Sequence, residues 1–411
     1  MTVRSPLIAP PDAVGVTSRA SRVAIMSLVT TVLIAPQEFK GSLTAAEAAR
    51  AIADGVRDAL PKAQIALQPM SDGGAGLVDA LLAALGGQRL TSPVHDPLLR
   101  PVDAAWALLA DGRAAIEMAA ASGLTLLAPG ELDPLRATTY GTGELIRAAL
   151  DRDYDEVIVG VGGSATVDGG AGALQALGVR LLDASGADLP PGGAALARLH
   201  RIDLSALDPR LAQARVRVAT DVRNRLCGAE GAALVFGPQK GASPDDVPVL
   251  DAALARFAEV ARRDLGVDLT SLDGGGAAGG LAAGLQLAGA TVEPGFDLVA
   301  SLVGLEDQVA RADIVITGEG RLDAQTAYGK TAAGVEKLAR AQGKPIIAIA
   351  GAIADDHARA AFDVALGATP EGTPLDDAMR DAPRLVREAA ERAVRALADV
   401  GDRRGSSLRW E

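Results

Sequence analysis

The sequence predicts an α/β protein of two α/β domains, one of them built on a mainly parallel sheet. Short runs rich in Val and Ile alternate with longer Ala/Leu segments of helical spacing, which is the pattern of β-α units. The chain has 411 residues, enough for two domains, and 49% of them are apolar. Aromatic residues contribute only 2%, whereas Gly occurs 47 times. We therefore expect cores of Val, Ile, Leu and Ala with many close backbone approaches.

Each expected element follows from its local pattern. The first long helix has a clear start signal, because Thr44 precedes the apolar periodicity and Glu47 completes a capping box. Strands are expected at the short apolar runs 29–35, 64–68, 114–118, 156–161, 215–220, 313–317, 346–350 and 363–366. Helices are expected over 44–60, 74–86, 141–151, 171–178, 247–265, 330–342 and 375–398.

Two segments mark changes of domain. Residues 95–119 predict a connection followed by an antiparallel hairpin, which turns at Asp111-Gly112. A Gly-rich stretch over 272–290 marks the second change, after which β-α alternation resumes. The alternative, two consecutive domains divided near residue 210, stays open.

The preferred organisation has one domain inserted into the other. Residues 28–97 plus 290–400 are expected to form a discontinuous Rossmann- or flavodoxin-like domain, and 98–289 the inserted α/β domain. Residues 1–27 predict a disordered extension, or an upstream start with Met26 as the real one, and 401–411 a tail.

Composition argues against several classes of protein. The formal net charge is −12, and no Lys/Arg block lies near an aromatic platform, so we expect no nucleic-acid partner. Cys227 is the only cysteine, which excludes an intrachain disulfide and fits a cytoplasmic location. The apolar stretch 22–36 lacks a small-residue cleavage site and is interpreted as the first buried strand. No run is long enough to span a membrane, so we expect no membrane partner.

Isolated acids and small residues follow the predicted strands at their carboxyl ends. Ligands of open parallel sheets bind there, because loops and helix N-termini present free N–H groups. One such acid is easily a cap or Asx-turn residue, but the recurrence favours a shared cleft. Flanking glycines let a phosphate approach the backbone, and a carboxylate can hold Mg²⁺ or accept a proton from a hydroxyl. The acids that predict phosphoryl transfer are Asp72, Asp168, Asp221, Glu319 and Asp323.

The stretch "GVGGSA" (160–165) satisfies the dinucleotide-binding fingerprint, and Asp183 lies near the place of a ribose-binding acid. However, the following "DGGAG" (168–172) keeps the chain in a loop where the fingerprint requires a helix. A wide, Gly-rich anion-binding loop is the preferred interpretation.

A second pattern is Ala324-x4-Gly329-Lys330-Thr331, one residue away from a Walker A loop. A true phosphate loop leaves its strand directly, and here "GEGRLD" is expected to lie between the strand end at Thr317 and Ala324. The loop can nevertheless bind phosphate through Thr326 and Lys330, near a helix N-terminus. Lys40, between the first strand and a capped helix, could neutralise a carboxylate or phosphate.

From about Leu28 to Asp399, the chain resembles the bacterial glycerate kinase family, which is distinct from the P-loop plant enzymes and the animal enzyme. The stretches that carry the resemblance occur in the family's order: "IAPQEFKGSLTAAEAA", "MSDGGAGLVDAL", "TYGTGELI", "GVGGSATVDGGAGALQALG", "FGPQKGA", "GAAGGLAAGL" and "ITGEGRLDAQTAYGK". The chain departs from the family's usual residues where Gln37-Glu38 replaces Asp-Ser, Ala75 replaces Glu and Arg223 replaces Asp.

The resemblance implies ATP- and Mg²⁺-dependent phosphorylation of D-glycerate, with position 2 favoured, and an active-site cleft between the two α/β domains. We assign Lys40, Asp72 and Asp168 to catalysis, with Asp72 or Asp168 orienting or deprotonating the glycerate hydroxyl. Metal binding is assigned to Asp221, Glu319 and Asp323. Substrate and phosphate binding is assigned to Gly73, Gly74, Gly162, Gly163, Ser164, Asn224, Gly318, Gly320, Thr326 and Lys330.

Two other classes stay open: a nicotinamide-dependent oxidoreductase that uses residues 160–183, and a non-catalytic small-molecule sensor of the same fold. Glycerate and ATP are the expected small-molecule partners, and the sequence does not distinguish a monomer from a homodimer.

Overall fold

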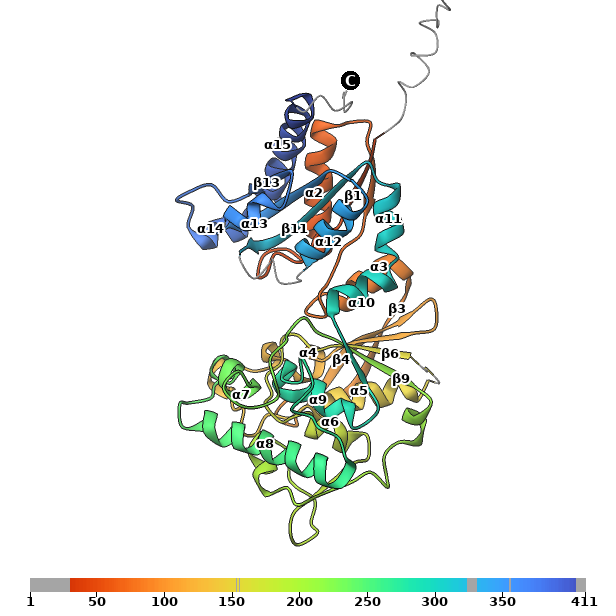
Figure 1. Cartoon of the computed structure of the whole chain (residues 1–411), viewed down its shortest axis with the longest axis vertical. Coiled ribbons are helices and arrows are strands. Elements are labelled where there is room, and N and C mark those ends of the chain that lie inside the picture. The colour runs from red at the N-terminus through yellow and green to blue at the C-terminus, as the bar shows by residue number, and fades with distance from the viewer. Residues whose placement is uncertain (1–29, 153, 155, 324–330, 355, 404–411) are drawn as a thin grey trace, which may run out of the picture.

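The computed structural model describes residues 30–403 except 153, 155, 324–330 and 355 (Figure 1). The extension predicted over 1–27 and most of the predicted tail lie outside these residues. The chain forms an α/β fold with two separate, mainly parallel sheets. In Figure 1 the sheets occupy two lobes, and α3 (Leu77–Leu85) and α10 (Gly295–Leu302) lie between them.

The first sheet combines strands from both ends of the chain in the order β13-β12-β11-β1-β2, with parallel pairing throughout. Val32 of β1 lies opposite Ile314 of β11 on one side and Ile65 of the edge strand β2 on the other. The strands are β1 (Thr31–Ile34), β2 (Gln64–Leu67), β11 (Ile314–Leu322), β12 (Ile346–Ile353) and β13 (Val364–Gly367).

The second sheet has the order β10-β9-β6-β5-β4-β3. The predicted hairpin is confirmed: β4 and β5 pair antiparallel, with Ala107 opposite Ala115. We did not predict β3, whose sequence "GQRLTSPVH" is largely polar and exposed, but which pairs with β4 along its length. The strands are β3 (Gly87–His95), β4 (Pro101–Leu109), β5 (Ala114–Glu117), β6 (Glu156–Gly160), β9 (Arg215–Ala219) and β10 (Thr291–Glu293). A small ribbon pairs β7 (Arg180–Leu182) with β8 (Arg201–Asp203).

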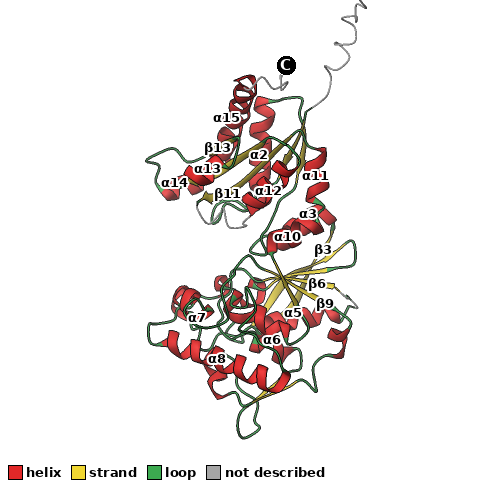
Figure 2. Ribbon diagram, viewed as in Figure 1, coloured by secondary structure: helices red, strands yellow, loops and turns green. Residues whose placement is uncertain are grey.

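Helices cover both sheets (Figure 2). The capping box at the start of α2 (Ala45–Ala59) is confirmed, because the Glu47 N–H donates to Thr44 Oγ1 at 3.2 Å and the Thr44 N–H donates to Glu47 Oε2 at 2.9 Å. The remaining helices are α4 (Ala119–Ser122), α5 (Tyr140–Leu150), α6 (Ala171–Ala176), α7 (Ala232–Phe236), α8 (Asp246–Leu265), α9 (Leu281–Gln286), α11 (Leu305–Arg311), α12 (Thr331–Ala341), α13 (Asp356–Ala360), α14 (Leu375–Arg380) and α15 (Ala382–Arg403).

Three apolar clusters stabilise this arrangement. One packs α2 and α15 against one face of the first sheet, and another packs α5, α6, α8 and α9 with the second sheet. The third includes Leu77 and Leu81 of α3, Phe296 of α10 and residues of both sheets, such as Val315 and Ile158. None of the helices in the described part of the chain has the length and apolar content that a bilayer crossing requires.

The strands divide between the sheets at two places in the sequence. The first sheet takes strands within 31–67 and 314–367, whereas the second takes strands within 87–293. β3 and β10, which lie within the range that we assigned to the discontinuous domain, thus pair in the second sheet. The domain boundaries at 97/98 and 289/290 stay a prediction.

Candidate active site

The carboxyl ends of the first sheet's strands lead into loops that are joined by backbone hydrogen bonds. The Gln37 N–H donates to the Gly318 carbonyl at 2.8 Å, which links the loop after β1 to β11. The Met70 N–H donates to the Pro36 carbonyl at 2.9 Å, which links the loops after β1 and β2. The polar residues after these strands therefore lie along one edge of the sheet.

The loop after β2 also packs against the second sheet, through contacts that only glycine permits. The Gly162 N–H donates to the Gly73 carbonyl at 3.3 Å. A Cβ on Gly73, whose φ is +88°, would lie 2.4 Å from the Ala219 carbonyl oxygen, and a Cβ on Gly295 would lie 1.8 Å from that of Asp72. Both distances are shorter than any contact between real atoms of these types, so a side chain at either position would displace the loop. The loop that carries Asp72 thus touches the ends of β6 and β9 and the start of α10.

Asp72 and Asp221 form a pair of acids at this junction. Asp72 is half-buried, and its Oδ1 accepts a hydrogen bond from the Gly74 N–H at 3.1 Å. Asp221 Oδ1 accepts from the Gly295 N–H at 2.7 Å, at the N-terminus of α10. Asp221 Oδ2 is buried and has no hydrogen-bond partner among the described residues. Burial, reinforced by the negative charge of Asp72, raises the pKa of Asp221 to about 6.

The pKa of Asp221 predicts a measurable effect on stability. Because its folded pKa lies above its ordinary value of 3.8, ionisation of Asp221 costs stability as the pH rises through about 6. Asp221→Asn keeps an oxygen acceptor for the Gly295 N–H and removes the charge. We expect the variant to melt roughly 2 °C higher than the wild type at pH 7.5 without divalent cations, and higher by less than half of that at pH 4.5, because most of the loss falls between pH 4.5 and 6. Thermal melts at both pH values measure this, with the exposed Asp103→Asn as control; a lower melting temperature at pH 7.5 would contradict it.

Asp168 is fully buried, and its carboxylate accepts hydrogen bonds from two segments of the chain. The Thr139 N–H and Oγ1 donate to Oδ2 at 2.8 and 2.9 Å, and Thr138 Oγ1 donates at 3.3 Å. The N–H groups of Gly170 and Gly172 donate at 3.0 and 3.2 Å. Burial raises the pKa of Asp168, and these hydrogen bonds oppose the shift. The carboxylate is placed to hold the Gly-rich loop against residues 138–139.

Lys240, which we did not single out from the sequence, lies beneath the same loop. It is 2% exposed, and its Nζ donates to Ser164 Oγ at 2.6 Å and to the Thr166 carbonyl at 2.7 Å. Burial lowers the pKa of Lys240 to about 7, and the charge of Asp168 opposes the shift. The "FGPQKGA" stretch contains this lysine, but its contact partners lie more than 70 residues away in the sequence.

The loop after β1 adds charged groups on the first-sheet side. Lys40 is exposed. Burial raises the pKa of Glu38, the positive charge of Lys40 opposes the shift, and Asp72 and Glu117 reinforce it. Glu117 ends β5, and its Oε1 accepts from the Val78 N–H at 2.9 Å, in the first turn of α3. Because this acid also lies at the carboxyl end of a strand, the rule that selected the other acids could have found it.

β11 is longer than predicted. It continues to Leu322 and pairs with β12 as far as Ile353, so the prediction that the strand ends at Thr317 is wrong. Glu319 is therefore a buried strand residue, 7% exposed, and Arg321 Nε lies 3.7 Å from Asp323 Oδ2. The strand leads almost directly into residues 324–330, so our argument against a Walker-type loop loses its premise.

The other predicted residues lie in neighbouring loops or outside the described part of the chain. Thr326 and Lys330 fall within the residues that the structure does not describe. A Cβ on Gly320 would lie 3.1 Å from the backbone nitrogen of Lys40, so Gly320 adjoins the loop after β1. Asn224 Nδ2 donates to the Glu230 carbonyl at 3.0 Å, within the loop that follows β9.

The dinucleotide interpretation of residues 160–183 is contradicted by the structure. α6 begins only at Ala171, so the chain stays in a loop for ten residues after β6, as we expected. Asp183 directly follows β7 of the small β7–β8 ribbon, and its Oδ1 accepts from the Ser185 and Ala187 N–H groups within a turn. An acid in that ribbon does not lie beside β6 in the parallel sheet, where a ribose-binding acid belongs.

The two acids at the junction could supply part of the ligand shell of a divalent cation. In the described part of the chain, no group of three or more His, Cys, Asp or Glu side chains could hold a metal ion. Mg²⁺ in phosphoryl-transfer sites needs only one or two carboxylates, because water and substrate phosphates complete its shell. The buried, unpartnered Oδ2 of Asp221 is a suitable ligand atom, and Asp72 is close enough to influence its charge. Metal binding by Glu319 and Asp323 stays a prediction.

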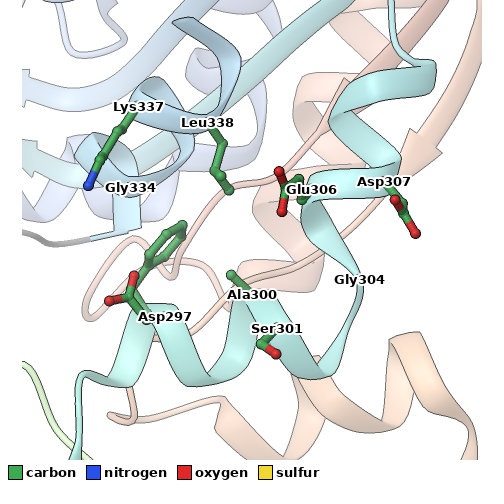
Figure 3. A pocket seen from close by; sticks show the side chains of 10 residues that line it. Asp297, Ala300, Ser301, Gly304, Glu306, Asp307, Gly334, Lys337 and Leu338 are labelled. Atoms are coloured by element: carbon green, nitrogen blue, oxygen red, sulfur yellow. The ribbon is translucent and has the colours of Figure 1, made fainter. Parts of the chain in front are cut away.

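A separate hollow of about 400 Å³ lies between α10, α11 and α12 (Figure 3). Asp297, Glu306 and Lys337 are among the residues that line it. None of the residues that we predicted for the site belongs to this lining, but the hollow adjoins the junction of Asp72 and Asp221, because the N–H of Phe296, which lines it, donates to Asp221 Oδ1 at 3.4 Å.

Comparisons with known proteins agree on one family. The sequence profile described as "Glycerate kinase family" matches residues 32–398. The glycerate kinase of Halalkalibacterium halodurans is 46% identical over 368 residues, which are 88% of this chain and 97% of that protein. The glycerate 2-kinase of Escherichia coli K12 is 44% identical over 373 residues, which are 89% of this chain and 98% of that protein. A crystal structure described as a candidate glycerate kinase 2 from Salmonella typhimurium LT2 matches with a TM-score of 0.81 and 45% identity, over 92% of this chain and 100% of that one.

Proposed function

The chain belongs to the glycerate kinase family, and from this premise we propose that it transfers the γ-phosphoryl group of ATP to a hydroxyl group of D-glycerate. The observation that carries the proposal is the junction of Asp72 and Asp221, where loops from both sheets meet. Phosphoryl transfer needs placement and charge compensation more than a strong base. Two carboxylates beside glycine-lined backbone fit that need.

Asp72 is the carboxylate that we propose to orient the glycerate hydroxyl and accept its proton. It is half-buried and so can be reached by a substrate, whereas Asp168 is fully buried and already accepts five hydrogen bonds. We therefore propose a positioning role for Asp168 in place of the catalytic role. Lys40, exposed on the neighbouring loop, would offset the charge of a phosphate or carboxylate.

Asp221 is the proposed magnesium ligand, with Glu319 in β11 and Asp323 just after this strand as further candidates. Mg²⁺ would neutralise charge on the β- and γ-phosphates of ATP. Gly318, Gly320, Thr326 and Lys330 would bind the phosphates near the N-terminus of α12, and the loops with Gly73, Gly74, Gly162, Gly163, Ser164 and Asn224 would bind glycerate. Although Gln37 stands where the family usually has Asp, Glu38 keeps a carboxylate near Asp72.

The product identifies both the reaction and the hydroxyl that is phosphorylated. We propose the 2-hydroxyl, a choice supported by the name of the Escherichia coli relative. Purified protein with Mg-ATP and D-glycerate should release ADP, and enolase added without a mutase should convert the product to phosphoenolpyruvate. ADP release with no enolase signal would show that the phosphate is attached at position 3. No ADP release would contradict the proposal that the protein is a glycerate kinase. A cytoplasmic location and a monomeric or homodimeric state belong to the same proposal.

A further inference from the structure

The contact between Lys240 and Ser164 has no explanation in the roles proposed so far. Lys240 belongs to a short 3₁₀ turn, Pro238–Lys240, and crosses beneath the Gly-rich loop. Its ammonium group uses two hydrogen bonds, to Ser164 Oγ and to the Thr166 carbonyl. A buried ammonium costs several kcal/mol of desolvation, so this placement is unfavourable unless the charge is used.

The contact with Lys240 determines which of the two groups donates the hydrogen bond. An ammonium group only donates, so Ser164 Oγ must act as the acceptor in the 2.6 Å contact. The Ser164 O–H is then left free to donate elsewhere. Ser164 is 7% exposed and its neighbour Gly163 is exposed, so Ser164 lies just beneath the surface of the loop, and Lys240, which is 2% exposed, lies deeper. A positive charge behind a hydroxyl donor is a suitable arrangement for binding an anionic oxygen.

We infer that Lys240 is a positioning residue that aims the Ser164 hydroxyl, and adds positive charge, toward an anionic oxygen bound at the Gly-rich loop. The oxygen belongs to a carboxylate or a phosphate, and in this enzyme these are the glycerate carboxylate and the ATP phosphates. The inference rests on the proposed function for the identity of the ligand, but the contact between Lys240 and residue 164 can be tested without it.

The protonation state of Lys240 predicts whether anion binding strengthens or weakens as the pH rises. Lys240 has a pKa of about 7 without a ligand, and Asp168 is the charged group that acts on it. A bound anion would favour the charged form, so an anion should bind more weakly as the pH rises above 7. Asp221, with a pKa of about 6, is already ionised over that range and does not contribute the same trend.

The first experiment measures KM and kcat for each substrate from pH 6.5 to 9, with the other substrate saturating. In the wild type, the KM of the substrate whose anion binds here should rise up to about tenfold per pH unit above 7. In Lys240→Met that KM should be at least about tenfold higher at pH 7 and independent of pH, with a smaller change in kcat. Ser164→Ala should raise the same KM, and the exposed Lys62→Met should match the wild type. A change in the glycerate KM identifies the carboxylate and a change in the ATP KM the phosphate; no change in either overturns the inference.

The second experiment does not depend on turnover. Ser164→Cys in a Cys227→Ser background places a thiol beside Lys240, and its alkylation by iodoacetamide is followed against pH. The midpoint should lie at least about one pH unit below the ordinary thiol value of about 8.5, and adding Lys240→Met should raise it to that value or above. The same midpoint with and without Lys240 overturns the inference even if the kinase is active. If Lys240→Met does not fold by circular dichroism, Lys240→Gln replaces it in both experiments.

Discussion

Asp72→Asn is expected to lower kcat for glycerate phosphorylation by about three orders of magnitude, with little change in stability. The substitution keeps the shape and the oxygen that accepts from the Gly74 N–H, but it removes the charge that would orient and deprotonate the hydroxyl. Because Asp72 is half-buried and makes few protein contacts, its loss should not disturb the loop. Steady-state kinetics and a urea denaturation curve measure the two effects.

Asp79→Asn is the matched control for this result. Asp79 lies on α3 close to the same loop, but it is exposed and pairs with Arg89. We expect kinetics within a few-fold of the wild type, since exposed ion pairs contribute at most about 1 kcal/mol. Activity of Asp72→Asn near that of Asp79→Asn would assign proton transfer to another group.

Asp168→Asn should act mainly through stability. One of its two oxygens becomes an NH₂ group, which cannot accept from the buried donors of Thr139 and the glycine N–H groups. Leaving such donors unsatisfied in the interior is expected to lower the free energy of unfolding by about 3 kcal/mol, and turnover should fall because the Gly-rich loop loses its anchor. Urea denaturation and kinetics on the same preparation check both parts.

Asp183→Asn provides the comparison for Asp168→Asn. Asp183 also accepts several hydrogen bonds in a turn, but it is only partly buried, so we expect a loss of about 1 kcal/mol or less and normal kinetics. If Asp168→Asn unfolds at the wild-type urea concentration and only turnover is lost, Asp168 takes the catalytic role that the sequence suggested, and our positioning role is wrong.

Strongly patterned elements could be predicted from the sequence, and weakly patterned ones could not. "EVIVG" of β6 is a buried apolar run, and every one of its residues is buried in the structure. β11 was cut short because Gly318 and Gly320 have low strand propensity, and pairing with β12 outweighs that preference. α10 was missed because eight residues after Pro294 are too few to display a helical period.

Some residues of the site could likewise be predicted from the sequence, and others could not. The acids at strand ends could be selected because parallel strands bring their carboxyl ends to one edge. The burial of Asp168 could not, since it depends on Thr138 and Thr139, which lie about 30 residues earlier. The contact of Lys240 with Ser164 spans 76 residues and has no local signal. The acids at the strand ends could therefore be predicted, whereas the buried contacts of Asp168 and Lys240 could not.

The crowding around Gly73, Gly162 and Gly295 bears on how such an enzyme can diversify. At each of these positions an added Cβ would meet backbone of another segment within 2.5 Å, so no other residue type fits without moving the loop. Asp72, which is half-buried beside them, is under no such geometric limit. Evolution toward a new acceptor molecule would thus proceed by substitution of the polar side chains, while the glycines, which have no side chain, keep the loops in place.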